Sequence, residues 1–454
     1  MREIIDMLRP GDIKLSPGRW GKFSERMAGW EDLLMPDIEA KASHEAARPG
    51  DLDTSFANNG FLTEAARGMG LPTGNGKHWI LTEPQRTGMA RIKVQRLLED
   101  GAPDESFPPE GKIVDLSLSG RVEVFKAGVQ SDGSLIIGGM LLSPGAGTPI
   151  IVRMTSEGDL DTSFGNAGIA LIHFKEKLDA NTFYDFAIQP DDRIVVALLV
   201  LIDYFVWDEE PRVVRLTRQG QLDTEFGKGG VVSGLPKHVA FFKIAVLKDD
   251  KLFLAGDSLA GDSAKSRHAV LARLNVDGSV DTLFGNEGYA MLHHPDYSGM
   301  RAHAIALSDR DDSVVVGGPL YTAHRSFGWI ARIRADGSLD DEFNGGKIFV
   351  FDGVIFSLAT QDDKIILRGP WQDGLDSFLY VARVDRHGSL DTTFGHGGVM
   401  IVARPVLNPN TPSLSSSFVQ GQERKTLLLS DLVILWEPNI GHTVMTQLVR
   451  LILT

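Results

Sequence analysis

The stretch GDLDTSFGNAG, residues 158–168, decides the fold because close copies of it return along the chain. They read GQLDTEFGKGG at 220–230, GSVDTLFGNEG at 278–288 and GSLDTTFGHGG at 388–398. Aligning the central aspartate of every copy gives seven positions: Asp53, Asp104, Asp161, Asp223, Asp281, Asp340 and Asp391. Each aspartate has a glycine three residues before it and a phenylalanine three residues after it. Self-similarity at a regular period indicates a repeat architecture.

The repeat has the length of a small all-β unit. Successive aspartates lie 51 to 62 residues apart, and the interval after Asp161 contains four runs rich in Val, Ile, Leu and Phe. A short acidic turn joins two runs of a unit, as in QPDDR at 189–193 and LKDDK at 247–251. Four-stranded antiparallel units repeated without helices are typical of the blades of a β-propeller.

An arginine stands eight residues before six of the seven aspartates, on the last expected strand of each unit. These arginines are Arg96, Arg153, Arg215, Arg273, Arg332 and Arg383. Asp53 has no such strand before it, whereas Arg450 lies near the C-terminus with no aspartate after it. The two incomplete ends fit each other. We therefore predict an all-β protein, a seven-bladed β-propeller of four-stranded antiparallel blades over residues 47–454, closed by the C-terminal strand.

The first 46 residues stand outside the repeat, and their pattern predicts a helix. Ser16 and Pro17 suit the N-cap and the first helical position. Apolar side chains then recur at helical spacing and form one stripe: Trp20, Phe23, Met27, Trp30 and Leu34. We expect a helical N-terminal extension over residues 1–46, whose stripe packs on the propeller or docks to a partner.

The sequence resembles the delta-60 repeat family, a bacterial repeat assigned to β-propellers. The resemblance rests on lines such as VLARLNVDGSVDTLFGNEG at 270–288 and YVARVDRHGSLDTTFGHGG at 380–398, and extends from about residue 50 to 454. It implies the propeller fold and supplies no catalytic residues. The chain departs from the pattern in PDESFPPEG at 103–111, and in the sixth copy, where Gly346 arrives one residue early. These departures predict less regular blades beside them and leave the fold assignment unchanged.

The Gly-Asp-Phe hinge is better explained by construction than by ligand binding, because every unit carries it. Glycine allows a tight turn with positive φ, and phenylalanine is an apolar anchor between blades. The aspartate can accept backbone N–H bonds and meet the arginine eight residues before it. A repeated calcium loop is the alternative, suggested by Asp51 with Asp53 and Asp159 with Asp161. The other copies have Gln, Ser or Ala two residues before the aspartate, which disfavours that alternative.

Composition restricts the partners. The formal charge of −14 disfavours binding to nucleic acid or to an anionic membrane surface through the overall field. The chain has no cysteine, which excludes disulfides and thiolate chemistry, and we identify no secretory signal or membrane-spanning segment in it. We expect a cytoplasmic protein, or one exported without a classical signal peptide. The motifs of phosphate loops, nucleophile elbows and zincins are missing from the sequence, so we assign no catalytic residue, cofactor or metal.

The variable segments are the connections between the strand after the acidic turn and the strand that carries the arginine. Their aromatic residues include Trp207, Tyr321, Trp329 and Trp371, which we take as candidate binding-loop residues. The alternative is that they cap the ends of the blades. A cluster of histidines in HHPDYSGMRAH, 293–303, is the densest set of metal-ligand types, although solvated loop residues explain it better. We predict a non-catalytic binding module for a protein or glycan partner; the alternative is an enzyme, of hydrolase or lactonase type, with a central site.

Overall fold

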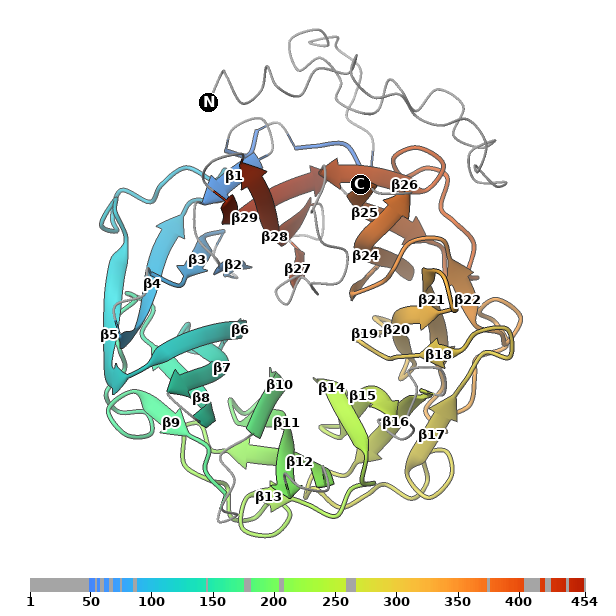
Figure 1. Ribbon diagram of the computed structural model, residues 1–454, viewed down its shortest axis with the longest axis horizontal. Coiled ribbons are helices and arrows are strands. Elements are labelled where there is room, and N and C mark those ends of the chain that lie inside the picture. Colours follow the sequence, from blue (N-terminus) through green and yellow to red (C-terminus); the bar gives the residue numbers. More distant parts are fainter. Residues whose placement is uncertain are drawn as a thin grey trace, which may run out of the picture.

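The computed structural model describes residues 49–452, apart from residue 54 and the segments 58–60, 65–67, 74–75, 85–87, 144–145, 175–180, 204–207, 259–266, 374–375, 404–416, 421–425 and 438–440. These described residues form β-strands and turns, with no helix among them. The strands build seven antiparallel sheets, which Figure 1 shows arranged in a ring. The prediction of an all-β propeller is confirmed, and the helix expected over residues 1–46 lies outside the described residues.

Three sheets follow one another in the first half of the chain. The first contains β2 (Gly68–Pro72), β3 (His78–Thr82), β4 (Met89–Leu97) and β5 (Lys112–Ser119). The second contains β6 (Arg121–Val129), β7 (Leu135–Ser143), β8 (Ala146–Met154) and β9 (Ile169–Leu171). The third contains β10 (Asn181–Ile188), β11 (Ile194–Asp203), β12 (Asp208–Leu216) and β13 (Val231–Val232).

The next three sheets repeat this order. The fourth contains β14 (Val239–Val246), β15 (Leu252–Ser258), β16 (Ala269–Leu274) and β17 (Tyr289–Leu292). The fifth contains β18 (Gly299–Met300), β19 (Ala304–Leu307), β20 (Val314–Tyr321), β21 (Ser326–Ile333) and β22 (Phe349–Phe351). Both β18 and β19 pair with β20, so together they form one interrupted innermost strand. The sixth contains β23 (Ser357–Gln361), β24 (Lys364–Asp373), β25 (Asp376–Val384) and β26 (Val399–Ala403).

The seventh sheet joins the two ends of the chain. Its order is β1 (Phe61–Glu64), β29 (Gly441–Ile452), β28 (Thr426–Glu437) and β27 (Ser417–Gln420). The outermost strand β1 pairs antiparallel with β29, with Phe61 opposite Val449. Asp53 N donates to Arg450 O at 2.9 Å just before this pairing begins. The blue β1 and the dark red β29 lie side by side in Figure 1, as expected for a ring closed by the C-terminal strand.

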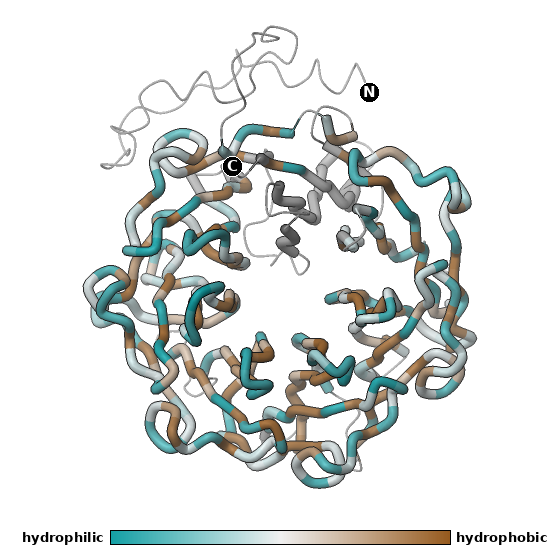
Figure 2. Tube along the Cα trace, turned by 180° about the vertical axis from the view of Figure 1, so that it is seen from behind, coloured by the Kyte–Doolittle hydropathy of each residue, from teal (hydrophilic) through white to brown (hydrophobic). Residues whose placement is uncertain are grey.

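Middle strands such as β15 are buried because neighbouring sheets cover them. All seven residues of β15 are buried, whereas residues of the outer strand β5 alternate between buried and exposed. The hydrophobic clusters cross from sheet to sheet: one of them contains Val195 of β11 with Leu254 of β15. Figure 2 shows hydrophobic segments within the sheets and hydrophilic segments in many of the peripheral loops. Face-to-face packing of apolar sheets therefore holds the ring together.

The hinges connect successive sheets through a glycine and a phenylalanine. Gly220 has φ +77°, and a Cβ on it would lie 2.6 Å from the ring of Phe164, the phenylalanine of the preceding hinge. Phe164 is fully buried. Only glycine combines this φ with so close an approach. The same contact closes the ring, because Gly50 near the start packs against Phe394 of the last hinge, and Gly395 N donates to Pro49 O at 2.9 Å.

Candidate functional site

The arginines and aspartates of the repeat form ion pairs at all seven hinges. The arginine Nε lies near the aspartate Oδ2 in each pair, with separations of 2.7 to 3.3 Å in six of them: Arg96–Asp104, Arg153–Asp161, Arg215–Asp223, Arg273–Asp281, Arg383–Asp391 and Arg450–Asp53. Arg332 and Asp340 form the remaining pair. An Arg–Asp pair at every sheet junction is a construction element, since a binding site would need only one or a few of them.

The hinge carboxylates are occupied by protein donors. Asp281 accepts from Arg273 and also from Lys251 Nζ at 2.9 Å. Burial raises the pKa of Asp281. The hydrogen bonds to this carboxylate and the nearby charge of Arg273 together lower the pKa by more, so the net pKa is below its usual value. Nη1 of Arg273 donates to the carbonyl oxygen of Ala335 in the next hinge. Each pair therefore fixes its own turn and ties it to the next sheet.

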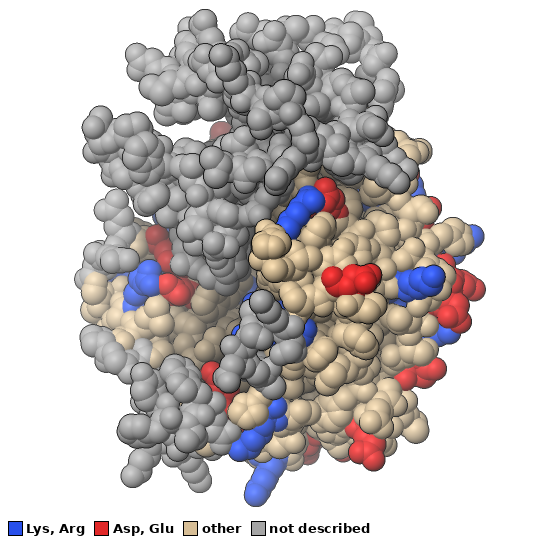
Figure 3. All heavy atoms as spheres, turned by 45° about the vertical axis from the view of Figure 1, so that its right-hand side comes forward, with Lys and Arg blue, Asp and Glu red and all other residues tan. Residues whose placement is uncertain are grey.

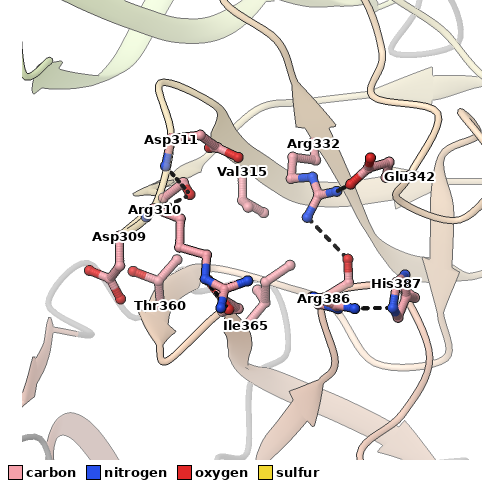
Figure 4. A pocket seen from close by; sticks show the side chains of 12 residues that line it. Asp309, Arg310, Asp311, Val315, Arg332, Glu342, Thr360, Ile365, Arg386 and His387 are labelled. Atoms are coloured by element: carbon pink, nitrogen blue, oxygen red, sulfur yellow. Dashed lines mark hydrogen bonds and ion pairs between the residues drawn. The ribbon is translucent and has the colours of Figure 1, made fainter.

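A surface pocket lies at one such junction, between the β19–β20 turn and the next hinge (Figure 4). Its arginine side chains contact other groups of the protein: Arg310 Nε lies 2.7 Å from Asp363 Oδ2, and Arg332 Nη1 donates to the backbone carbonyl oxygen of Arg386 at 3.0 Å. Arg386 Nε in turn contacts His387 Nε2 at 2.9 Å. Because the same arginine-to-carbonyl bond recurs at other hinges, the pocket belongs to the junction architecture.

The four candidate binding-loop residues have different surroundings. Trp329 and Trp371 are buried, with exposed fractions of 0% and 8%. Trp207 lies outside the described residues, and Tyr321 is half-buried at the end of β20. Trp329 Nε1 donates to Arg301 O at 2.9 Å, so this indole supports a neighbouring segment from within the core. Of the three described residues, only Tyr321 retains substantial exposure for a ligand.

A row of aromatic side chains lies on the innermost strands of the third to sixth sheets. The row consists of Tyr184 on β10, Phe242 on β14, His303 before β19 and Phe356 before β23, and all four are half-buried. The ring of Phe242 lies 4.9 Å from that of Tyr184 and 4.5 Å from that of His303. His303 and Phe356 stack at 6.3 Å. We call these four residues the aromatic row; β10, β14 and β19 lie at the inner side of the ring in Figure 1.

Local irregularities of the inner strands position the row. The pairing of β10 with β11 shifts between Phe183 and Asp185, and that of β14 with β15 shifts between Phe241 and Lys243. The residue left unpaired by each shift is a member of the row, Tyr184 or Phe242. In the fifth sheet His303 lies in the interruption between β18 and β19. Bulges of this kind redirect a side chain away from the regular pleat and are common beside functional sites.

Two arginines from neighbouring sheets meet on one buried carboxylate beside the aromatic row. Asp257 at the end of β15 has an exposed fraction of 0%. Its Oδ2 lies 3.1 Å from Arg267 Nη1 and 3.1 Å from Arg301 Nε. The two arginine side chains, called the arginine pair below, remain 27% and 26% exposed. Arg301 also lies over the ring of Tyr321, 5.6 Å from its centroid. The site therefore combines flat apolar rings with accessible cations.

The charges around the row have both signs: the carboxyl groups of Glu209 and Asp257 act most strongly on Tyr184, whereas three cations act on His303. Burial, together with the charges of Arg301, Lys243 and Arg267, lowers the pKa of His303 to about 3. Burial likewise lowers the pKa of Lys243. Burial raises the pKa of Tyr184 well above its ordinary value. At neutral pH His303 and Tyr184 are therefore uncharged and the surrounding arginines are charged.

An ion pair also links the inner strands of the second and third sheets. Lys126 Nζ lies 2.7 Å from Asp185 Oδ1, and Ile244 N on the fourth sheet donates to Asp185 Oδ2 at 3.1 Å. Asp185 is almost fully buried. This carboxylate satisfies the backbone beside the bulge of β14 and so holds Phe242 in place.

Sequence reasoning missed the aromatic row and the arginine pair. A usable signal existed: an aromatic residue or histidine stands five residues before the first residue of the acidic turn in five units, at Phe125, Tyr184, Phe242, His303 and Phe356. The arginine pair left no such signal, because Arg267 and Arg301 occupy positions outside the repeat. Their proximity arises from the parallel bridge of Arg267 with Gly299 between two sheets.

Metal binding finds no support in the part of the chain that the structure describes. No group of three or more His, Asp or Glu side chains is arranged there to hold an ion. In the segment 293–303, His294 Nδ1 lies 3.9 Å from Asp296 Oδ2. His303 of the same segment instead belongs to the aromatic row. A search for a long apolar helix able to cross a membrane finds none among the described residues.

Comparisons with known proteins agree on the fold. Residues 130–164 and 247–284 match a family described as "Domain of unknown function (DUF5122) beta-propeller", which supports a bacterial β-propeller repeat. No curated protein matches the chain. The solved structure of the polysaccharide lyase Uly1 is similar with a TM-score of 0.50 and 9% identity, covering 92% of this chain and 94% of that one. Drosophila Semaphorin 2a is similar with a TM-score of 0.50 and 10% identity, covering 90% and 76%. At these identities the likeness concerns the fold alone, and the two descriptions differ in function.

Proposed function

We propose that this protein is a non-catalytic binding module that holds a saccharide on the aromatic row of a seven-bladed propeller. Each of the seven sheets is taken as one blade, and the Gly-Asp-Phe hinge as a repeat of the delta-60 type. The observation that carries the proposal is the contiguous row of four half-buried rings from four successive sheets, with centroids 4.5 to 6.3 Å apart. Aromatic faces offer a large, rigid apolar area, and the Tyr184 hydroxyl adds a polar contact.

The state of the ionisable groups favours binding over catalysis. A general acid or base works best with a pKa near the operating pH. The pKa of His303 is lowered to about 3 and that of Tyr184 is raised, so both move away from neutrality. Asp257 lies against two arginines that hold its carboxylate. His303, Tyr184 and Asp257 are therefore suited to forming a binding surface, with the arginine pair at its edge.

An enzyme remains the second candidate because of Glu209. Burial raises the pKa of this carboxyl group, partly offset by the charges of His238 and Arg267. Burial also raises the pKa of Asp257. Two carboxyl groups with raised pKa values near a sugar-binding surface are the arrangement from which glycoside hydrolysis could be built. Product release from a bound polysaccharide, abolished in Glu209→Gln, would favour this candidate.

A panel of neutral and acidic oligosaccharides, titrated calorimetrically into the full chain, tests the proposal. We expect binding to at least one class and a loss of about tenfold or more in Phe242→Leu, since central aromatic contacts dominate such sites. The matched control is Phe125→Leu, which changes the equivalent bulge residue of β6 outside the row. No binding to any saccharide, or equal loss in both variants, would contradict the proposal.

A further inference from the structure

We infer that the ligand held on the aromatic row carries a carboxylate, and that the guanidinium groups of Arg267 and Arg301 bind it. This inference rests on the proposed saccharide-binding function and names the chemical class of the ligand, an acidic saccharide with uronate residues. Two observations carry it: the unused donors of the arginine pair, and the position of the pair beside the rings.

The arginine pair has more donors than the protein uses. Each guanidinium offers five N–H donors. Asp257 Oδ2 accepts a hydrogen bond from Nη1 of Arg267 and lies 3.1 Å from Nε of Arg301 as an ion pair. Within the described part of the chain, the remaining nitrogens, Nε and Nη2 of Arg267 and Nη1 and Nη2 of Arg301, have no hydrogen-bond partner. Because both side chains are about a quarter exposed, these donors can reach a second anion.

The charges explain why the second anion is needed. One buried carboxylate cannot neutralise two guanidinium groups, so the trio carries one net positive charge. Glu209 also acts electrostatically on Arg267, but among the described residues no ion pair joins the two side chains, so Glu209 does not occupy a donor of the pair. At His303 the charges that act most strongly are three cations, Arg301, Lys243 and Arg267. A positive site of this kind in a chain of formal charge −14 stands out from its surroundings.

On the face drawn in Figure 3, acidic and basic side chains lie scattered over the described part, often close to one another. Other exposed arginines among the described residues have their own partners, as Arg91 Nε does with Asp115 Oδ2 at 3.0 Å. The arginine pair, by contrast, presents planar forks whose geometry matches a carboxylate.

The arginine pair lies next to the aromatic row, because Arg301 is close to His303 in the chain. Arg301 and His303 are two residues apart on the same inner segment, so a cation and a ring of the row share one backbone. Tyr321 lies under Arg301, and Trp329 Nε1 holds the Arg301 carbonyl oxygen. A sugar ring on the row would therefore place its substituents within reach of the pair. A uronate carboxylate is the substituent that this arrangement favours.

The test compares acidic oligosaccharides with neutral forms of the same backbone. The probes are oligosaccharides of galacturonan, alginate and hyaluronan, together with their carboxyl-reduced counterparts and a sulfated neutral glucan. We expect at least one acidic probe to bind tenfold or more tightly than its reduced form. Arg267→Gln and Arg301→Gln should each remove most of this preference, so that the affinity ratio between the acidic probe and its reduced form falls toward one. Arg91→Gln, an exposed arginine away from the site, is the matched control.

Each other result has a distinct meaning. Equal binding of an acidic probe and its reduced form overturns the carboxylate inference and leaves the proposed saccharide binding standing. Tighter binding of the sulfated glucan than of every uronate probe also overturns it. No binding of any probe overturns both proposals. If a single variant fails to fold, judged by circular dichroism, Arg267→Lys keeps the charge and loses the planar fork, and an unchanged acidic preference in that variant would contradict fork recognition.

Discussion

Arg273 and Asp281 hold the two ends of one hinge together, with Nε of the arginine 2.7 Å from Oδ2 of the aspartate. Both side chains are at least 90% buried, and Nη1 of Arg273 continues to the carbonyl oxygen of Ala335 in the next hinge. Removing one partner of a buried pair leaves an uncompensated charge. Arg273→Met should therefore lower the free energy of unfolding by about 3 kcal/mol, measured by urea denaturation.

Arg91→Met is the control for this measurement. Arg91 pairs with Asp115 at 3.0 Å, but the side chains are 36% and 41% exposed. An exposed pair contributes about 0 to 1 kcal/mol, so the control should change stability little. Equal effects of the two substitutions would contradict a structural role for the hinge pair.

The hinge glycines provide a second test, because space and backbone conformation can be separated. Gly220→Ala would place a Cβ 2.6 Å from the ring of Phe164 at φ +77°. Gly229→Ala meets nothing within 4 Å at φ +64°. The second substitution should cost about 1 kcal/mol for left-handed backbone alone, and the first about 1–3 kcal/mol more for overpacking. Denaturation midpoints of both variants measure the difference, and similar midpoints would show that the phenylalanine contact is unimportant.

Closure of the ring depends on β29. Truncation after residue 440 removes this strand with Arg450, exposes one edge of β28 and leaves β1 without its partner. Unpaired strand edges promote association between chains. The truncated protein should aggregate or melt at a lower temperature than the full chain, by light scattering and circular dichroism. A control lacking only residues 453 and 454 should behave like the full chain, and a stable, monomeric truncation would contradict the closure.

The sequence was sufficient for the fold because the same physical requirement is repeated at every hinge. At six of the seven hinges a glycine approaches the phenylalanine of the preceding hinge, and at the other Gly388 approaches Asn344. These glycines, and an arginine that meets an aspartate eight residues later, leave fixed spacings in the chain. The pairing of Arg450 with Asp53 could be predicted from two incomplete copies. The exposure of single aromatic side chains could not be predicted from the sequence. Trp329 and Trp371 lie in loops by sequence pattern, but β21 and β24 extend through these positions and bury both rings.

The arginine pair and its carboxylate could not be predicted from the sequence. Asp257, Arg267 and Arg301 come from two sheets and from positions that do not repeat, so no spacing relates them. Their convergence depends on how the start of β18 packs beside β16, through the bridge of Arg267 with Gly299. Such contacts follow from the closed ring and become visible only once neighbouring sheets are placed.

His303 gives the last prediction, on the dependence of stability on pH. Burial together with the charges of Arg301, Lys243 and Arg267 lowers its pKa from 6.5 to about 3. Below pH 6.5 the unfolded chain binds a proton at this histidine and the folded chain does not. The contribution of His303 to stability is therefore complete above pH 6.5 and is lost progressively as the pH falls toward 3.

The variant His303→Phe keeps an aromatic ring in the row and removes the titration. Between pH 6.5 and pH 4.5 the wild-type protein should lose about 2 kcal/mol more unfolding free energy than this variant, at about 1.4 kcal/mol per pH unit less a discount for partial exposure. Carboxylates such as Asp281 titrate in both proteins and cancel in the comparison, as does His78, whose pKa burial also lowers. Urea denaturation at several pH values in this range measures the difference. Parallel stability profiles would mean that His303 accepts a proton in the folded state, and hence that the cations around the aromatic row do not act on it as their positions indicate.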